Sequence, residues 1–196
     1  PAGPACAAPP ARMKPVSLAG AAFLALLFLP AAQAVQLAAM AEGSFGFRAS
    51  VEGEMFEARF LDYLVVPQLG ADRRPTGFAV EISLSRIDSQ NPDRDSEMRS
   101  AEWFDTATHP VASFQADEVE TGPWGGHVAK GDLLIKGTLR SVRVPFSWQI
   151  GPRRLHMAGE VGLDRRWFDL GPEDVTSIAA DVTVFFDLSW AFDDKD

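Results

Sequence analysis

Apolar and polar residues alternate with a period of two along much of the chain. The alternation is clearest in residues 78–84, 142–148 and 182–190, where every second residue is a large apolar one. Phe185 adds one apolar residue on the other face of the last segment. Alternation of this kind predicts strands with one buried and one solvated face. The pattern therefore indicates a sheet that covers an apolar core on one side.

Five further segments alternate less regularly and are separated by glycine- and proline-containing turns such as Pro67–Gly70, Lys136-Gly137 and Gly151-Pro152. These five predicted strands span residues 44–50, 54–66, 111–119, 127–135 and 154–163. About eight short strands predict an all-β barrel or a sandwich. Short turns between neighbours favour up-and-down antiparallel order, so we expect an eight-stranded antiparallel β-barrel with an interior lined by the apolar faces.

One segment has the pattern of a helix instead. Asn91 is a suitable N-cap, Pro92 fits the first helical position, and Asp93 places an acid in the first turn. We expect a short helix over about residues 92–103, in a connection between strands. Trp103 and Phe104 would then anchor the end of the helix on the barrel.

The N-terminal segment has the order of a secretory signal. Arg12 and Lys14 precede an apolar run, Leu18–Leu29, and Ala32-Gln33-Ala34 follows as a small-x-small cleavage site. The alternative is an uncleaved membrane anchor, although the run is short for a bilayer, which takes about 20 apolar residues. We expect residues 1–34, an upstream extension and a signal peptide, to be removed after Ala34. Residues 35–196 would form one domain.

Composition narrows the function classes. The formal net charge of −9 disfavours binding to nucleic acid, because an acidic surface repels phosphates. The three histidines lack zinc-ligand spacing, and the acids around residues 164–181 lack the spacing of a calcium loop. No Gly-x-Ser-x-Gly elbow is present, and Cys6 is the one cysteine, within the segment predicted to be removed. We expect no metal, no catalytic residues and no enzymatic activity.

Several spaced motifs occur in a characteristic order. Segment 85–114 contains Ile87-Asp88, Arg94-Asp95, Met98-Arg99-Ser100 and Trp103-Phe104-Asp105, and a Gly-x-Leu-x-Ile-x-Gly-x-x-Arg-x-Val step follows at 131–142. Leu163-Asp164-Arg165 comes later. Together they resemble the YceI family of bacterial periplasmic, lipocalin-like proteins. The chain departs from the family pattern at Ala49-Ser50, where many members have a histidine, and around Trp167-Phe168-Asp169.

This resemblance implies a lipocalin-like antiparallel barrel that encloses an isoprenoid lipid, a polyprenol or an isoprenoid quinone. It implies a periplasmic carrier with no cofactor other than a bound isoprenoid lipid or quinone. Some family members lie beside cytochrome b561-type membrane proteins, so a partner of that kind is also implied. The sequence leaves the oligomeric state open, a homodimer included.

Binding energetics are compatible with such a ligand. A buried methylene contributes about 0.8 kcal/mol. Micromolar affinity needs about 8 kcal/mol net, after association costs of roughly 4–15 kcal/mol. Something like 15–30 methylene equivalents must therefore be buried, which a long isoprenoid tail supplies. The predicted interior residues are the apolar strand faces: Phe45, Phe47, Phe60, Phe78, Val80, Ile82, Leu84, Phe114, Leu133, Ile135, Val142, Val144, Phe146, Trp148, Val184 and Phe186.

The same side chains could instead fill the barrel completely. In that alternative the protein is an interaction module that docks on an envelope partner, such as a cytochrome b561-type membrane protein. The role of the two arginines in the predicted helix is also open. Arg94 and Arg99 could form ion pairs with Asp95 that pin the helix over the barrel, or they could bind a polar head group at its mouth.

Overall fold

The computed structural model of the protein describes residues 41–122 and 125–191. The predicted extension and signal peptide, residues 1–34, lie outside the described residues. The described part is an antiparallel β-sheet with one α-helix, which confirms the predicted all-β class. The strands are β1 Glu42–Val51, β2 Glu54–Phe60, β3 Tyr63–Leu69, β4 Pro75–Ser83, β5 Ile87–Asp88, β6 Val111–Thr121, β7 His127–Ile135, β8 Thr138–Ile150, β9 Arg154–Asp164 and β10 Asp181–Ala191.

The sheet contains ten strands in the order β3-β4-β6-β7-β8-β9-β10-β1-β2-β5, so the predicted number of eight was wrong. The predicted strand 54–66 is two strands, because Leu61 and Asp62 break its pairing. The second extra strand is β5, which a 3-10 turn, Leu84–Arg86, separates from β4. Neither break interrupts the alternation strongly enough to be visible in the sequence.

The two breaks lie opposite each other and are hydrogen-bonded together. The Leu61 amide donates to the carbonyl of Arg86, and the Ser83 amide donates to the carbonyl of Asp62, both over 2.9 Å. Thus β2 pairs with β1 and β5, while β3, the next strand in the chain, pairs with β4. A sharp bend at this point lets the sheet curl back toward its first strand.

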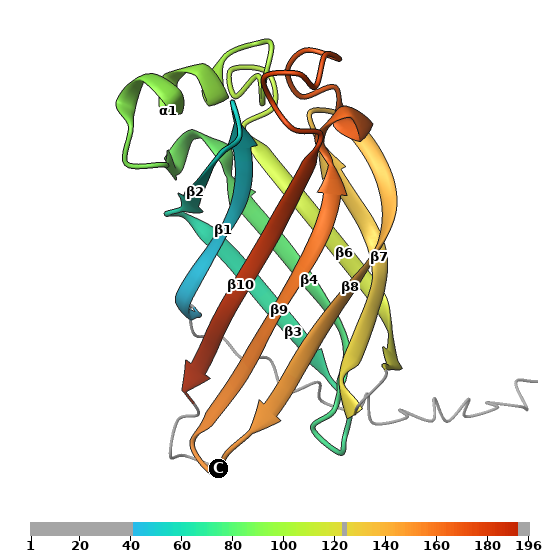
Figure 1. Cartoon of the computed structure of the whole chain (residues 1–196). Coiled ribbons are helices and arrows are strands. Elements are labelled where there is room, and N and C mark those ends of the chain that lie inside the picture. The colour runs from blue at the N-terminus through green and yellow to red at the C-terminus, as the bar shows by residue number, and fades with distance from the viewer. Residues whose placement is uncertain (1–40, 123–124, 192–196) are drawn as a thin grey trace, which may run out of the picture. The chain divides into compact units, whose positions relative to one another are not determined.

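Figure 1 shows the resulting strongly curled, barrel-like sheet, with α1 and the loop before β10 at one end. The start of β3 contacts β1 across the curl. The Tyr63 hydroxyl donates to the Gly43 carbonyl over 3.3 Å, and the Tyr63 ring packs edge-on to Phe45 with centroids 5.4 Å apart. The apolar faces of the strands consequently surround a common interior.

Helix α1, Pro92–Arg99, begins as the sequence predicts. The Asn91 side chain accepts hydrogen bonds from the amides of Asp93 and Arg94, both at 3.1 Å, and Pro92 occupies the first turn. The predicted end at residue 103 was wrong, because the backbone of Ser100 is extended and the next residues form turns. Met98 and Phe104 are buried and Trp103 is half-buried, so this segment packs on the end of the sheet as expected.

Phe185, the apolar residue on the otherwise polar outer face of β10, packs against residues of β1. Phe185 lies opposite Gly46 in the pairing of β10 with β1, and a side chain at Gly46 would collide with its ring. The guanidinium of Arg48 lies over the ring, 4.5 Å from its centre. Phe185 is therefore buried on the outside of the sheet, between a glycine and an arginine.

The end of the sheet opposite α1 is filled by side chains. Leu155 and Trp190, which pair across β9 and β10, are almost fully buried there. Phe146 stacks on His127 with ring centroids 5.3 Å apart, and Trp148 donates to the Arg73 carbonyl over 3.4 Å. This end of the barrel is a packed core.

Burial in this core lowers the pKa of His127, and the nearby charge of Arg74 lowers it further. The unfolded chain then binds more protons than the native protein below the ordinary histidine pKa of 6.5, so stability should fall as the pH drops below that value. His127→Phe keeps the ring packing and removes the titration. We expect urea unfolding between pH 5 and 7 to show a flatter pH dependence for this variant. His109 and His156 are present in both proteins, so an unchanged slope would contradict the assignment to His127.

Candidate functional site

The half of the interior near α1 is hollow. A cavity of about 470 Å³ lies within the curled sheet, and its lining is almost entirely apolar. Its floor includes Phe78, Val144, Met157 and Leu188, which lie above the packed end. A space of this size exceeds by far the volume that one water needs, yet it offers few polar partners to hold ordered water. It falls in the range typical of small-molecule sites.

Most of the predicted interior residues line this cavity. They are Phe45, Phe47, Phe60, Phe78, Val80, Ile82, Leu84, Phe114, Leu133, Ile135, Val142, Val144, Val184 and Phe186. Phe146 and Trp148 lie outside its lining, in the packed end. Period-two alternation places all of them on one face, and only their height along the strands separates the hollow half from the filled half.

Other lining residues were not predicted. Val182 and Leu188 continue the alternation of β10, and Met157 and Val161 lie on the inner face of β9, so the same periodicity could have found them. Those at the entrance, such as Ile178, come from loops, where no periodicity marks the inner side. Only the folded structure brings these loop residues to the cavity.

A buried arginine organises the loop at the entrance. Arg165 is 3% exposed, and its side chain donates five hydrogen bonds, all to backbone carbonyls of the segment that leads into β10. A guanidinium has five N–H donors, so its hydrogen-bonding capacity is fully used. The acceptors are the carbonyls of Leu170, Pro172, Asp174, Ile178 and Ala179. One side chain thereby fixes the conformation of residues 170–179.

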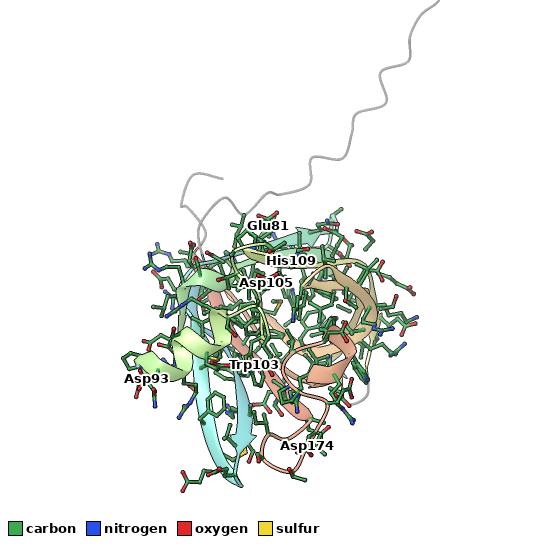
Figure 2. The ribbon with its side chains drawn as sticks, turned by 90° about the horizontal axis from the view of Figure 1, so that it is seen from above. Glu81, Asp93, Trp103, Asp105, His109 and Asp174 are labelled. Atoms are coloured by element: carbon green, nitrogen blue, oxygen red, sulfur yellow. The ribbon has the colours of Figure 1, made fainter. Side chains whose placement is uncertain are left out.

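Trp103 joins this loop to the segment after α1. Its indole N–H donates to Glu97 over 3.1 Å, and its ring packs so closely on Gly171 that a Cβ there would be 2.6 Å from it. The Arg165 guanidinium lies 5.7 Å from the centre of the ring. Figure 2, seen from above, shows Trp103 between the helix that carries Asp93 and the loop that carries Asp174. Trp103 therefore lies at the entrance and narrows it.

The two arginines of α1 have different surroundings. Arg94 lines the cavity, and its guanidinium lies 4.2 Å from the centre of the Phe56 ring. Arg99 donates to the Ile87 carbonyl over 3.5 Å, at the outer limit for a hydrogen bond, and so faces β5. The predicted ion pairs with Asp95 do not form, because Asp95 accepts from the amide and the hydroxyl of Ser89. Arg94 thus remains the candidate for a polar head group, and Arg99 contributes to holding the helix.

The described ranges, 41–122 and 125–191, contain no helix that is long and apolar enough to span a membrane. Within the same ranges no group of three histidine, cysteine or acidic side chains could hold a metal ion.

A curled antiparallel sheet around an apolar cavity, with a few polar groups at the entrance, defines a lipocalin-like class of fold suited to an apolar ligand. The family follows from sequence: a model of the YceI-like domain matches residues 34–190, so the chain belongs to this family. The resemblance found in the motifs is thereby confirmed. No curated protein matches the chain significantly.

Solved structures agree on the fold. BcnA of Burkholderia cenocepacia is 18% identical with a TM-score of 0.71, covering 75% of this chain and 95% of its own. The YCEI protein of Campylobacter jejuni is 15% identical with a TM-score of 0.63, covering 70% and 85%. A polyisoprenoid binding domain from Saccharophagus degradans, described as implicated in plant cell wall breakdown, is 15% identical with a TM-score of 0.55, covering 77% and 94%. At these identities the likeness concerns the fold.

Arg165 offers a test of how the entrance is built. In Arg165→Met the buried carbonyls lose their donors, and each buried unsatisfied group costs about 1–3 kcal/mol. We expect the free energy of unfolding to fall by about 3 kcal/mol or more, since several carbonyls are affected. The matched control is Arg166→Met, which removes a partly exposed ion pair with Asp164 that solvent screens, so its loss of stability should be clearly smaller. Urea denaturation of both variants measures the difference, and equal losses would refute the role of Arg165.

Proposed function

We propose that the protein binds an isoprenoid lipid, a polyprenol or an isoprenoid quinone, in its interior and acts as a periplasmic carrier. The observation that supports the proposal most directly is the hollow half of the barrel. Its lining comes from nearly every strand, yet it does not close the space. Empty apolar volume is costly to a folded protein, and an apolar ligand would replace the missing contacts.

The chemistry of the lining favours a lipid tail over a polar ligand. Apart from the groups of α1 and Arg165 at the entrance, the lining side chains are overwhelmingly aliphatic or aromatic. An apolar surface of this kind gains free energy from hydrocarbon in proportion to the area removed from water. The phenylalanine rings of β1, β2, β4 and β6 provide flat, rigid walls for a slender chain.

Proteins with the same fold also support the binding of an isoprenoid. The domain from Saccharophagus degradans, which shares the fold, is described as a polyisoprenoid binding domain. Membership of the YceI-like family supports a binding function. The periplasmic location rests on the predicted signal peptide. A carrier needs both an export route and a site that shields the tail from water.

The alternative, a filled barrel that acts only by docking on an envelope partner, has less support. It requires the apolar side chains to occupy the whole interior, whereas they fill only the end opposite α1. A cytochrome b561-type partner stays a prediction of the family resemblance.

Filling the cavity should weaken binding while preserving the fold. Val184 lines the cavity, so Val184→Trp would occupy space that a ligand needs. The matched control is Val111→Trp, at a valine that is 47% exposed on β6. We expect the dissociation constant for an isoprenoid quinone to rise at least about tenfold in Val184→Trp, as it would for a loss of about 1.4 kcal/mol. Val111→Trp should bind like the wild type.

Calorimetric titration with delipidated protein measures both constants, and circular dichroism verifies that each variant is folded. Equal affinity of the folded Val184→Trp variant and the wild type would contradict binding in this cavity.

A further inference from the structure

Exposed apolar and basic side chains lie together on one side of the cavity entrance. Leu139, at the start of β8, is 60% exposed, and it pairs with Leu134 of β7, which is also exposed. Trp167, in the 3-10 turn that follows β9, is 46% exposed. Arg140 connects β8 with this turn, because its Nε donates to the Trp167 carbonyl over 3.1 Å. These residues form the rim patch: Leu134, Lys136, Leu139, Arg140 and Trp167.

The rim patch borders the cavity entrance. Leu133 and Ile135, the inner-facing neighbours of Leu134, line the cavity. The Lys136 ammonium donates to the carbonyls of Glu102 and Asp169, over 3.0 and 2.8 Å. These two bonds tie the turn between β7 and β8 to the segment after α1 and to the entrance loop. A surface that contacts the rim patch therefore lies beside the opening of the cavity.

The two cations of the rim patch are not neutralised by a carboxylate. Within the described ranges, Lys136 and Arg140 donate to backbone carbonyls and form no ion pair. Arg143, further along β8, is paired with Glu120. The stretch 133–159 contains no acidic residue, although the chain has 27. Lys136 and Arg140 consequently keep their charge available to a partner outside the chain.

The acids around the rim patch have partners of their own or lie away from it. Asp164 pairs with Arg166 at 2.6 Å, and Asp132 accepts from the Ser141 hydroxyl over 2.6 Å. The acids of α1 lie elsewhere: in Figure 2, Asp93 is at the left, whereas the pale yellow and orange ribbons of β7 and β8 are at the right. The basic side of the entrance is thus distinct from its acidic side.

A surface of this composition matches the headgroup region of a bilayer. Tryptophan is enriched at membrane interfaces, and exposed apolar side chains flanked by basic ones bind anionic lipids through both kinds of contact. We propose that the rim patch docks the protein on a phospholipid bilayer with an anionic surface. The formal net charge of −9 does not prevent this contact, because physiological salt screens charges beyond about 8 Å.

Docking goes beyond the proposed function and does not depend on which ligand the cavity holds. The rim patch is small, so the contact is reversible and weakens when salt screens the charges of Lys136 and Arg140. If the cavity also carries a lipid, docking by this side brings the entrance next to the membrane from which that lipid comes.

Vesicle co-sedimentation of the purified protein tests the proposal. One set of vesicles is pure phosphatidylcholine, and the other contains phosphatidylcholine and phosphatidylglycerol in equal parts. We expect binding to the mixed vesicles to be at least about fivefold stronger, which is the effect of one basic residue near an anionic surface. Added salt should reduce the difference between the two sets.

A pair of matched variants locates the contact. Leu139→Gln, Arg140→Gln removes one exposed apolar and one basic side chain from the rim patch, and we expect it to lose most of the preference for mixed vesicles. The control is Ile150→Gln, Arg154→Gln, which makes the same changes at the other ends of β8 and β9. Ile150 is 39% exposed and Arg154 forms an exposed ion pair with Glu42. The control should bind like the wild type.

Tryptophan fluorescence gives a second, independent measurement. Among the described residues Trp167 is the only exposed tryptophan. Mixed vesicles with brominated acyl chains should therefore quench the fluorescence of the wild type, and Trp167→Phe should remove most of this quenching. Circular dichroism verifies that each variant is folded. Arg140→Gln alone keeps a donor for the Trp167 carbonyl and serves if the double variant does not fold.

Absence of binding to the mixed vesicles, equal binding to both sets, or equal losses in the two double variants would overturn membrane docking. Undiminished quenching in Trp167→Phe would do the same. The rim patch would then be a candidate for contact with another protein. The cavity titration with Val184→Trp uses no vesicles, so the carrier proposal stands or falls separately.

Discussion

A curled sheet with apolar residues around its whole inner face must either fill its interior or leave room for another molecule. In this protein both occur, at different heights. Side chains such as Trp190 and Phe146 fill one end, whereas those nearer α1 leave a cavity of about 470 Å³ between them. Protein interiors are normally packed to the density of organic crystals. A hollow of this size is thus a departure from ordinary packing, and the loops and side chains around it have to keep it open.

A hollow interior needs an entrance that holds its shape. Loops are ordinarily the least ordered parts of a barrel, because few of their backbone groups are bonded within the fold. Here the loop before β10 is organised from inside by Arg165, whose charge is balanced by carbonyl dipoles and not by a carboxylate. Trp103 joins this loop to the end of α1. The polar groups of the entrance are consequently held by the same contacts that shape it.

Much of the fold could be predicted, because strand periodicity directly records which residues face inward. The inner faces of β4, β8 and β10 and the N-terminus of α1 follow from alternation and capping. The breaks at Leu61-Asp62 and Leu84–Arg86 could not be predicted, since a bent strand keeps its alternation while its pairing partner changes. The end of α1 at Arg99 was missed because Ser100 leaves the helix without a glycine or proline to mark it.

The site was predictable only in part, for a similar reason. Periodicity identifies Phe78 and Phe146 as inward-facing alike, but only the three-dimensional arrangement shows that the first borders a cavity and the second lies in a packed cluster. The role of Arg165 depends on carbonyls that lie 5 to 14 residues away in the chain. A loop conformation of this kind leaves no regular pattern in the sequence.

If the proposed function is right, the cavity holds an isoprenoid lipid in the cell. The decisive measurement is native and denaturing mass spectrometry of the protein purified from the cells that produce it, without added lipid. We expect an extra mass in the native spectrum that is lost on denaturation and matches an isoprenoid quinone or alcohol in a solvent extract. A native mass equal to that of the polypeptide alone, with no uptake of added quinone or polyprenol, would contradict it.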